Sequence, residues 1–129
     1  MRAPIAIAAI ASLFAAPVAF AQASPQTVVQ RNVDAYRAGD LERFVSTFAH
    51  DATVVVNGEE IQGHSRIHAF YRSSFADGPN TIRITESEMR EGRILLTIAY
   101  DFGDGVERCC SYHEYVVVDG KIVWHEAIV

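Results

Sequence analysis

Two histidines and two glutamates near the carboxyl end of the chain have the residue types and the spacing of an acid–base pair. They lie on either side of Asp119-Gly120, a dipeptide typical of a tight β-hairpin turn. Cross-strand pairing in such a hairpin places His113 opposite Glu126. It places Glu114 opposite His125 on the other face. Such a pair suits general acid–base catalysis, for example proton abstraction next to a carbonyl, although similar pairs also occur as plain cross-strand packing.

The part of the chain that precedes this hairpin, and must position it, is expected to start with helices. Ser24-Pro25 is typical of a helix start and Gly39 of a helix end, and Asp40 can cap a second helix. Apolar residues at helical spacing predict three helices, over 25–38, from 41 to about His50-Asp51, and over 63–75.

Strands dominate the rest of the chain. Ala52 to Val56 is rich in β-branched residues, and from Asn80 onward the apolar period changes to two. Turn-forming glycines separate four strands, expected over 80–90, 93–102, 106–118 and 121–129, as an antiparallel meander. The sequence therefore predicts a single α+β domain in which three N-terminal helices pack on a curved sheet.

Composition and targeting signals narrow the possible partners. Residues 1–23 have a positive start, an apolar run broken by Pro17 and small-residue cleavage sites, which is typical of a secretory signal peptide. We therefore expect a periplasmic or secreted protein consisting of domain 24–129, with no stable membrane insertion after cleavage. The net charge of −5 and the dispersed cations argue against binding of nucleic acid.

The sequence offers no signature of a metal or cofactor site. Cys109 and Cys110 are the only cysteines, and neighbours in a regular strand point to opposite faces, so no disulfide is expected. Neither a nucleophile elbow nor a phosphate-binding glycine loop is present. We therefore expect no metal and no cofactor.

Several segments resemble one known family. They are Val28-Val29-Gln30-Arg31, Ala38-Gly39-Asp40-Leu41, Phe48-Ala49-His50-Asp51-Ala52-Thr53, Gly63 with Ile67 and Phe70, and Asp119-Gly120-Lys121-Ile122. Residues 24–129 resemble the NTF2-like superfamily, within it the SnoaL-like and ketosteroid isomerase-like branches. The resemblance implies a conical barrel whose bent, antiparallel or mixed sheet wraps around the first helix and leaves a pocket, often with dimerisation through the sheets.

Alignment with ketosteroid isomerases places the family's catalytic positions on different residue types. The catalytic tyrosine falls on Asn32 and the aspartate base on Val56, which can neither abstract nor donate a proton. The third catalytic position falls on His113 or Glu114. The sequence therefore argues against the ketosteroid isomerase mechanism.

The face of the last hairpin that lines the pocket depends on the register. In SnoaL-like relatives the catalytic acid and the aromatic residue of this hairpin commonly sit at His113 and Glu126, which favours the face that also carries Trp124. The isomerase register favours the face of Glu114 and His125, and a bulge near the cysteines could change the alternation. The expected ligand-binding residues are Asn32, Tyr36, Val56, Tyr100 and Trp124.

Two functions remain open. The first is an exported, homodimeric pocket protein that binds a small, mostly apolar or carbonyl-containing metabolite. The second is a cofactor-independent isomerase, cyclase or dehydratase, which would use His113 with Glu126, or His125 with Glu114, as base and orienting partner.

Overall fold

A computed structural model describes residues 22–129 of the chain. The expected signal peptide lies outside this range except for its last two residues. Three helices and six strands follow one another as α1 (Pro25–Ala38), α2 (Leu41–Ser46), β1 (Phe48–Val56), β2 (Glu59–Gln62), α3 (His64–Phe75), β3 (Thr81–Arg90), β4 (Arg93–Asp101), β5 (Arg108–Val118) and β6 (Lys121–Ile128). Within residues 22–129, no helix has the length and apolar character needed to cross a membrane.

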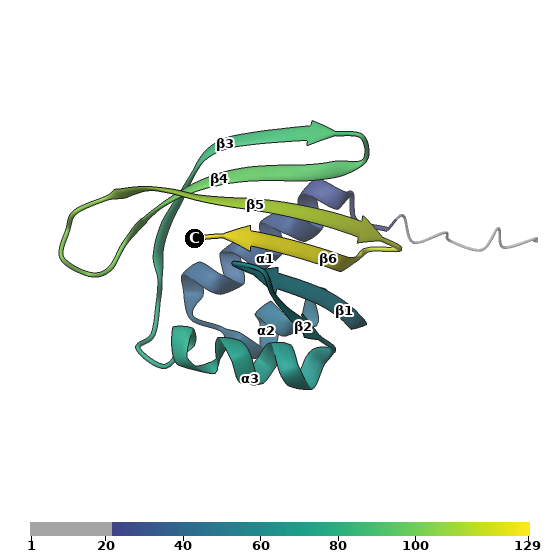
Figure 1. The fold of residues 1–129 in the computed structure, drawn as a ribbon, viewed down its shortest axis with the longest axis horizontal. Coiled ribbons are helices and arrows are strands. Elements are labelled where there is room, and N and C mark those ends of the chain that lie inside the picture. The colour runs from purple at the N-terminus through teal and green to yellow at the C-terminus, as the bar shows by residue number, and fades with distance from the viewer. Residues whose placement is uncertain (1–21) are drawn as a thin grey trace, which may run out of the picture.

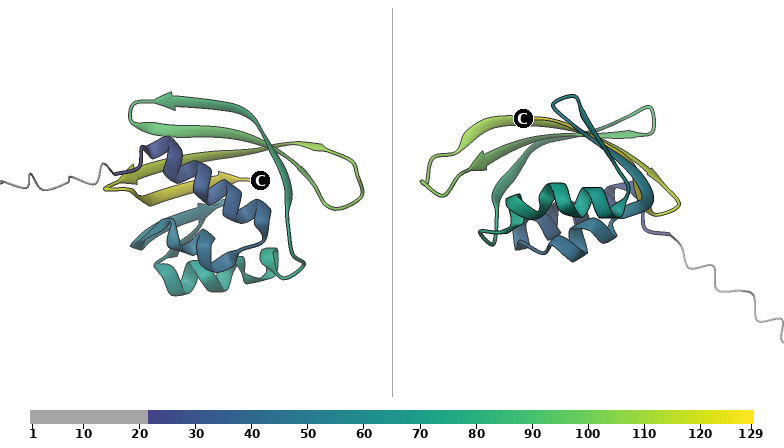
Figure 2. Two further views of the ribbon diagram at one scale, coloured as in Figure 1. Left: turned by 180° about the vertical axis from the view of Figure 1, so that it is seen from behind. Right: turned by 60° about the horizontal axis from the view of Figure 1, so that its bottom comes forward.

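The six strands form one mixed sheet in the order β2-β1-β6-β5-β4-β3. Strands β3 to β6 form the expected antiparallel meander, and β6 also pairs in parallel with β1. The sheet is strongly bent, and all three helices lie on its concave side (Figures 1 and 2). The predicted α+β architecture is therefore confirmed, and no helix of residues 22–129 covers the opposite face of the sheet.

Local signals at α1 act as the sequence predicts. The Ser24 hydroxyl accepts a hydrogen bond from the Thr27 backbone N–H, and Gly39 ends the helix in the left-handed conformation, at φ 70°. A Cβ atom at Gly39 would lie only 2.8 Å from the backbone carbon of Gly78. Glycine is therefore required where the loop after α1 crosses the loop after α3.

The chain differs from the sequence-based expectation in two places after α2 begins: where that helix ends, and in the additional strand β2. The helix ends at Ser46, and Phe48 begins β1 because it pairs with Ile122 of β6, which is distant in sequence. The four-residue strand β2 was not predicted. It follows the Asn57-Gly58 turn and pairs with β1 as a short hairpin at the edge of the sheet.

Aromatic side chains fill the space between the helices and the sheet. Phe44 of α2 is 2% exposed, and its ring centroid lies 4.7 Å from that of Tyr71 and 5.2 Å from that of Phe75. The ring of Phe48 packs edge-on against Phe44 from β1, with the centroids 5.4 Å apart. Phe44 thus connects the three helices to the sheet.

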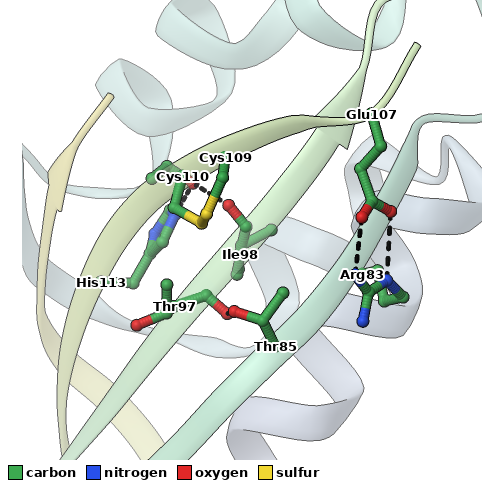
Figure 3. The surroundings of a disulfide bond; sticks show 9 residues. Arg83, Thr85, Thr97, Ile98, Glu107, Cys109, Cys110 and His113 are labelled. Atoms are coloured by element: carbon green, nitrogen blue, oxygen red, sulfur yellow. Dashed lines mark hydrogen bonds and ion pairs between the residues drawn. A yellow bond between two sulfur atoms is a disulfide. The ribbon is translucent and has the colours of Figure 1, made fainter.

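The cysteines do not behave as predicted. Cys109 and Cys110 are joined by a disulfide at the start of β5, close to Ile98 of the neighbouring strand (Figure 3). Ile98 pairs with Ser111 and Tyr100 with Arg108, so both cysteines lie in a bulge opposite one residue of β4. The expectation of no disulfide is wrong because it assumed a regular strand, whose side chains alternate.

Candidate functional site

A bulge in the last hairpin changes the expected cross-strand pairs. Val117 pairs with Ile122 as predicted, but Val116 pairs with Trp124, so that Val123 is an extra residue of β6. Beyond it every residue of β6 is displaced by one position relative to β5, which reverses the face on which each side chain lies. The predicted pairing of residues is therefore wrong from this point onward.

Both expected His–Glu pairs are absent for this reason. Glu114 pairs with Glu126, and His113 pairs with Ala127. The two glutamates lie on the sheet face away from the helices, where Arg93 donates a 2.7 Å hydrogen bond to Glu114. Neither glutamate can orient a histidine, and the favoured combination of His113, Trp124 and Glu126 on one face does not form.

A cavity of about 500 Å³ lies between the helices and the concave side of the sheet. Four of the five predicted ligand-binding residues line it, namely Asn32, Tyr36, Val56 and Tyr100. Trp124 does not, because the bulge places its side chain on the outer face. The apolar part of the wall includes Val33, Phe44, Phe70, Ile82 and Ile98. A mostly apolar wall with a few polar groups is typical of small-molecule sites.

The two histidines meet each other in this cavity. His113 Nδ1 lies 2.9 Å from His125 Nε2, and His113 Nε2 lies 2.8 Å from Ser111 Oγ. The three side chains thus form one hydrogen-bonded chain, which joins β5 to β6. The His125 ring is sandwiched between aromatic neighbours, with the Tyr115 centroid at 4.2 Å and the Phe48 centroid at 6.2 Å.

The hydrogen-bond partners indicate the direction of this chain. Ser111 Oγ donates to the Ile98 carbonyl at 3.4 Å, so we assign His113 Nε2–H as the donor to Ser111. His125 Nε2–H then donates to His113 Nδ1, and a lone pair remains unpartnered on the buried His125 Nδ1. The opposite direction would leave an unpaired N–H there, and buried N–H groups without acceptors are rarer than unpaired acceptors. In this arrangement neither nitrogen of His113 has a free lone pair.

Both imidazoles are uncharged at neutral pH. Burial lowers the pKa of His113 to about 4. Burial, followed by the proximity of His113, lowers the pKa of His125 well below the ordinary histidine value. Because a general base is most effective when its pKa is near the working pH, this chain is better suited to hydrogen bonding than to proton abstraction at pH 7.

Asn32 presents an acceptor to the cavity. Its Nδ2 donates to Thr47 Oγ1 at 2.9 Å, and the Thr47 hydroxyl donates in turn to the Phe44 carbonyl. The threonine hydrogen is therefore already used, which fixes the orientation of the Asn32 amide and turns Oδ1 away from Thr47. Asn32 lines the cavity although it is only 2% exposed.

Sequence reasoning missed three contributors to this wall. Ser111, Tyr115 and Tyr71 line the cavity, but no role was predicted for any of them. One signal in the sequence could have identified Tyr71, because it lies within the apolar stripe of α3. A buried tyrosine needs a hydrogen-bond partner for its hydroxyl, so it is a candidate for a cavity wall. Residues 22–129 contain no cluster of three His, Cys, Asp or Glu side chains suited to a metal ion.

Comparison with solved structures identifies relatives of the same architecture. A candidate polyketide cyclase from Sinorhizobium meliloti is 22% identical, with a TM-score of 0.66 over 78% of this chain and 93% of that one. A protein with a ketosteroid isomerase-like fold from Catenulispora acidiphila, in complex with trimethylamine, is 15% identical, with a TM-score of 0.65 over 81% and 85% of the chains. TerC co-crystallised with polyporic acid is 18% identical, with a TM-score of 0.64 over 80% and 88%.

These similarities confirm the NTF2-like fold, and at such identities they show the fold alone. No protein of curated function matches the sequence. A family model describing the SnoaL-like domain matches residues 29–125, from α1 to the cavity histidine of β6. The chain therefore belongs to the SnoaL-like domain family within the NTF2-like fold.

Proposed function

We propose that this protein binds a small, uncharged, mostly apolar metabolite in the cavity between its helices and its sheet. The observation that carries this proposal is the character of the wall, which is largely apolar and, among residues 22–129, includes no lysine or arginine. Among residues 22–129, the one carboxylate side chain of the wall is Asp101, which already accepts hydrogen bonds from three backbone N–H groups. An anionic ligand would lose its hydration without gaining a partner of opposite charge.

Two relatives of the same fold support a small-molecule ligand, since both were solved with a small molecule present. The neutral histidines add to it, because they line the cavity as hydrogen-bonding groups without a charge. The direction assigned to their chain leaves no free base facing the ligand.

Filling the cavity should abolish binding. Ala127 lies on the wall and is 2% exposed, so Ala127→Leu should place three additional carbons in the space that the ligand occupies. We expect an at least tenfold higher Kd for a bicyclic hydrocarbon such as tetralin, measured by NMR titration. Thr97→Leu, on the outer face of β4, is the matched control and should bind like the wild type. Unchanged binding in Ala127→Leu would contradict the proposal.

A second candidate function is a cofactor-independent isomerase, cyclase or dehydratase. The chain from Ser111 through His113 to His125 supports it, because the reverse hydrogen-bond direction would make His113 Nε2 a proton acceptor. The test is exchange of the α-hydrogens of 1-tetralone for deuterium in D₂O, followed by NMR. Exchange that disappears in His113→Gln would favour the enzyme. No exchange above the buffer rate would leave ligand binding alone.

We also propose that the protein is a homodimer formed through the outer face of the sheet. This face carries Tyr112, Val116, Trp124 and Ile128, of which Tyr112 and Ile128 are each 57% exposed. Such an apolar surface is typical of an interface. Val116→Arg should convert a dimer into a monomer in sedimentation velocity experiments, and a monomeric wild type at micromolar concentration would refute the dimer.

Export is the remaining proposal, and it is supported by the composition of residues 1–23. The experiment is expression of the full chain in a Gram-negative host. Mass spectrometry of the periplasmic fraction should find a protein that begins near Ser24.

A further inference from the structure

The disulfide between Cys109 and Cys110 closes almost no loop. Because the two residues are neighbours, the bond restricts the unfolded chain very little and contributes little to the free energy of unfolding. Cys109 is exposed, so a thiolate from solvent can reach it, and exposed disulfides are the ones that thiols reduce most readily. The position of this bond therefore suits a reactive disulfide better than a stabilising one.

The disulfide and the bulge at the start of β5 depend on each other. Ile98 pairs with Ser111 and Tyr100 with Arg108, so both cysteines lie opposite Ala99 alone. Neighbours in a regular strand point to opposite faces, where their sulfur atoms cannot meet. Loss of the bond permits regular pairing, which would displace the chain before Ser111 by one position relative to β4.

The residue before the disulfide holds the mouth of the cavity. Both terminal nitrogens of Arg108 donate to the Asp104 carboxylate, at 3.1 and 2.6 Å. The same guanidinium group lies 5.3 Å from the ring centroid of Phe102. Phe102 lines the cavity although it is 79% exposed, so its ring stands at the opening. Arg108 thus fixes the loop between β4 and β5 at the cavity mouth.

The residue after the disulfide belongs to the inner wall of the cavity. Ser111 is 4% exposed and begins the hydrogen-bonded chain that continues through His113 to His125. The disulfide lies beside this chain, next to His113 and the carbonyl of Ile98 that Ser111 contacts (Figure 3). A displacement at the bulge therefore reaches the cavity at two places, its mouth and its inner wall.

We propose that Cys109–Cys110 is a redox site that dithiols reduce, and that its redox state controls the affinity of the cavity for its ligand. The redox reaction stands on its own, whereas the effect on affinity rests on the proposed binding function. The oxidised protein holds the bulge, Arg108 and Ser111 in the arrangement described above. The reduced protein releases the bulge and binds the ligand more weakly.

The reaction is a thiol–disulfide exchange. A thiolate of the dithiol attacks the exposed Cys109 Sγ, the bond between the two cysteines breaks, and Cys110 leaves as a thiolate that takes up a proton. The second thiolate of the reductant then attacks its own sulfur bound to Cys109, and Cys109 leaves in the same way. Two electrons and two protons pass to the protein, and the dithiol becomes a disulfide.

Thiol counting tests the redox site without any ligand. Cys109 and Cys110 are the only cysteines of the chain, so no other thiol contributes to the count. Protein purified without reductant should take up no iodoacetamide, and after treatment with dithiothreitol it should take up two equivalents, by mass spectrometry of the intact chain. Oxidised glutathione should restore the unreactive form. Two thiols that stay reactive in oxidised glutathione, or a bond that excess dithiothreitol leaves intact in the folded protein, would overturn the proposal.

NMR titration with tetralin measures the effect on the cavity. We expect the Kd of the reduced protein to be at least about threefold higher than that of the oxidised protein, because the mouth and the inner wall are displaced. The double variant Cys109→Ser/Cys110→Ser should bind like the reduced wild type, and dithiothreitol should not change its Kd. This variant also excludes an effect of the reductant itself.

Two arginine substitutions test the connection between the bulge and the mouth. Arg108→Gln removes the contacts to Asp104 and Phe102, so it should raise the Kd of the oxidised protein toward the reduced value. Arg93→Gln is the matched control, because Arg93 pairs with Glu114 on the outer face of the sheet. The control should bind tetralin like the wild type in both redox states.

The outcomes separate this inference from the function beneath it. Reduction should shift the backbone amide resonances of Phe102 and Ser111 and leave that of Ile67 in α3 unchanged. Equal affinities for tetralin in the two redox states would overturn the control of the cavity and leave the binding function standing. Failure of tetralin to bind in either state would refute the binding function and the effect on affinity together, while the thiol count and the amide shifts still decide the redox site.

Discussion

Replacing Phe44 with alanine should lower the free energy of unfolding by about 3 to 5 kcal/mol, the range for truncation of a buried aromatic residue. Phe44 is 2% exposed, and its ring contacts aromatic rings from α1, α3 and β1. Its removal leaves a void where the three helices meet the sheet, and the surrounding rings can refill this void only in part. Urea denaturation followed by circular dichroism measures the effect.

Phe102 provides the control for this substitution. It is 79% exposed, so Phe102→Ala should change the free energy of unfolding by less than about 0.5 kcal/mol. A loss for Phe44→Ala no larger than that for Phe102→Ala would show that the aromatic cluster does not stabilise the domain.

Acidification from pH 6.5 to pH 4 should lower the free energy of unfolding by at least about 3 kcal/mol. Burial lowers the pKa of His113 to about 4 and that of His125 further, whereas both return to ordinary histidine values in the unfolded chain. The unfolded chain therefore binds more protons in this interval. The stability that the neutral histidines provide is fully present above pH 6.5 and is lost as the pH falls below it.

Urea titrations at half-unit pH intervals test this expectation, because the loss caused by the histidines begins near pH 6.5, above the range in which ordinary carboxylates protonate. His113→Gln removes one titrating group and should flatten the pH dependence, whatever its stability at pH 7. His50→Gln removes an exposed histidine of β1 and serves as the control. The same slope in His113→Gln and in the wild type would contradict a buried neutral imidazole at this position.

The features that follow from local chemistry could be predicted from the sequence. Ser24 and Gly39 begin and end α1 through contacts within a few residues, and Asp119-Gly120 forms the predicted turn. The period-two pattern likewise identified β3 to β6. The α+β class and the resemblance to the NTF2-like fold therefore required no knowledge of distant contacts.

The bulge at Val123 could not be predicted, because its cause is not local. The pairing of β1 with β6 changes register over the same stretch, between the partners of Ile122 and Trp124. The bulge thus coincides with pairing to β1, whose residues lie some seventy positions away in sequence. Neither the turn nor the alternating pattern of β5 and β6 contains this information. The consequence was an incorrect acid–base pair, although both histidines line the cavity.

The order of the strands implies that this domain completes its folding late. Strand β6 is the last to be synthesised, yet it lies between β1 and β5 and is hydrogen-bonded to both (Figure 1). Until it leaves the ribosome, the β1–β2 hairpin and the β3–β5 meander have no strand to connect them, and each exposes an unpaired edge. Such edges invite intermolecular pairing, so the growing chain is more prone to aggregate than the finished one, and a factor that shields nascent chains should raise its yield.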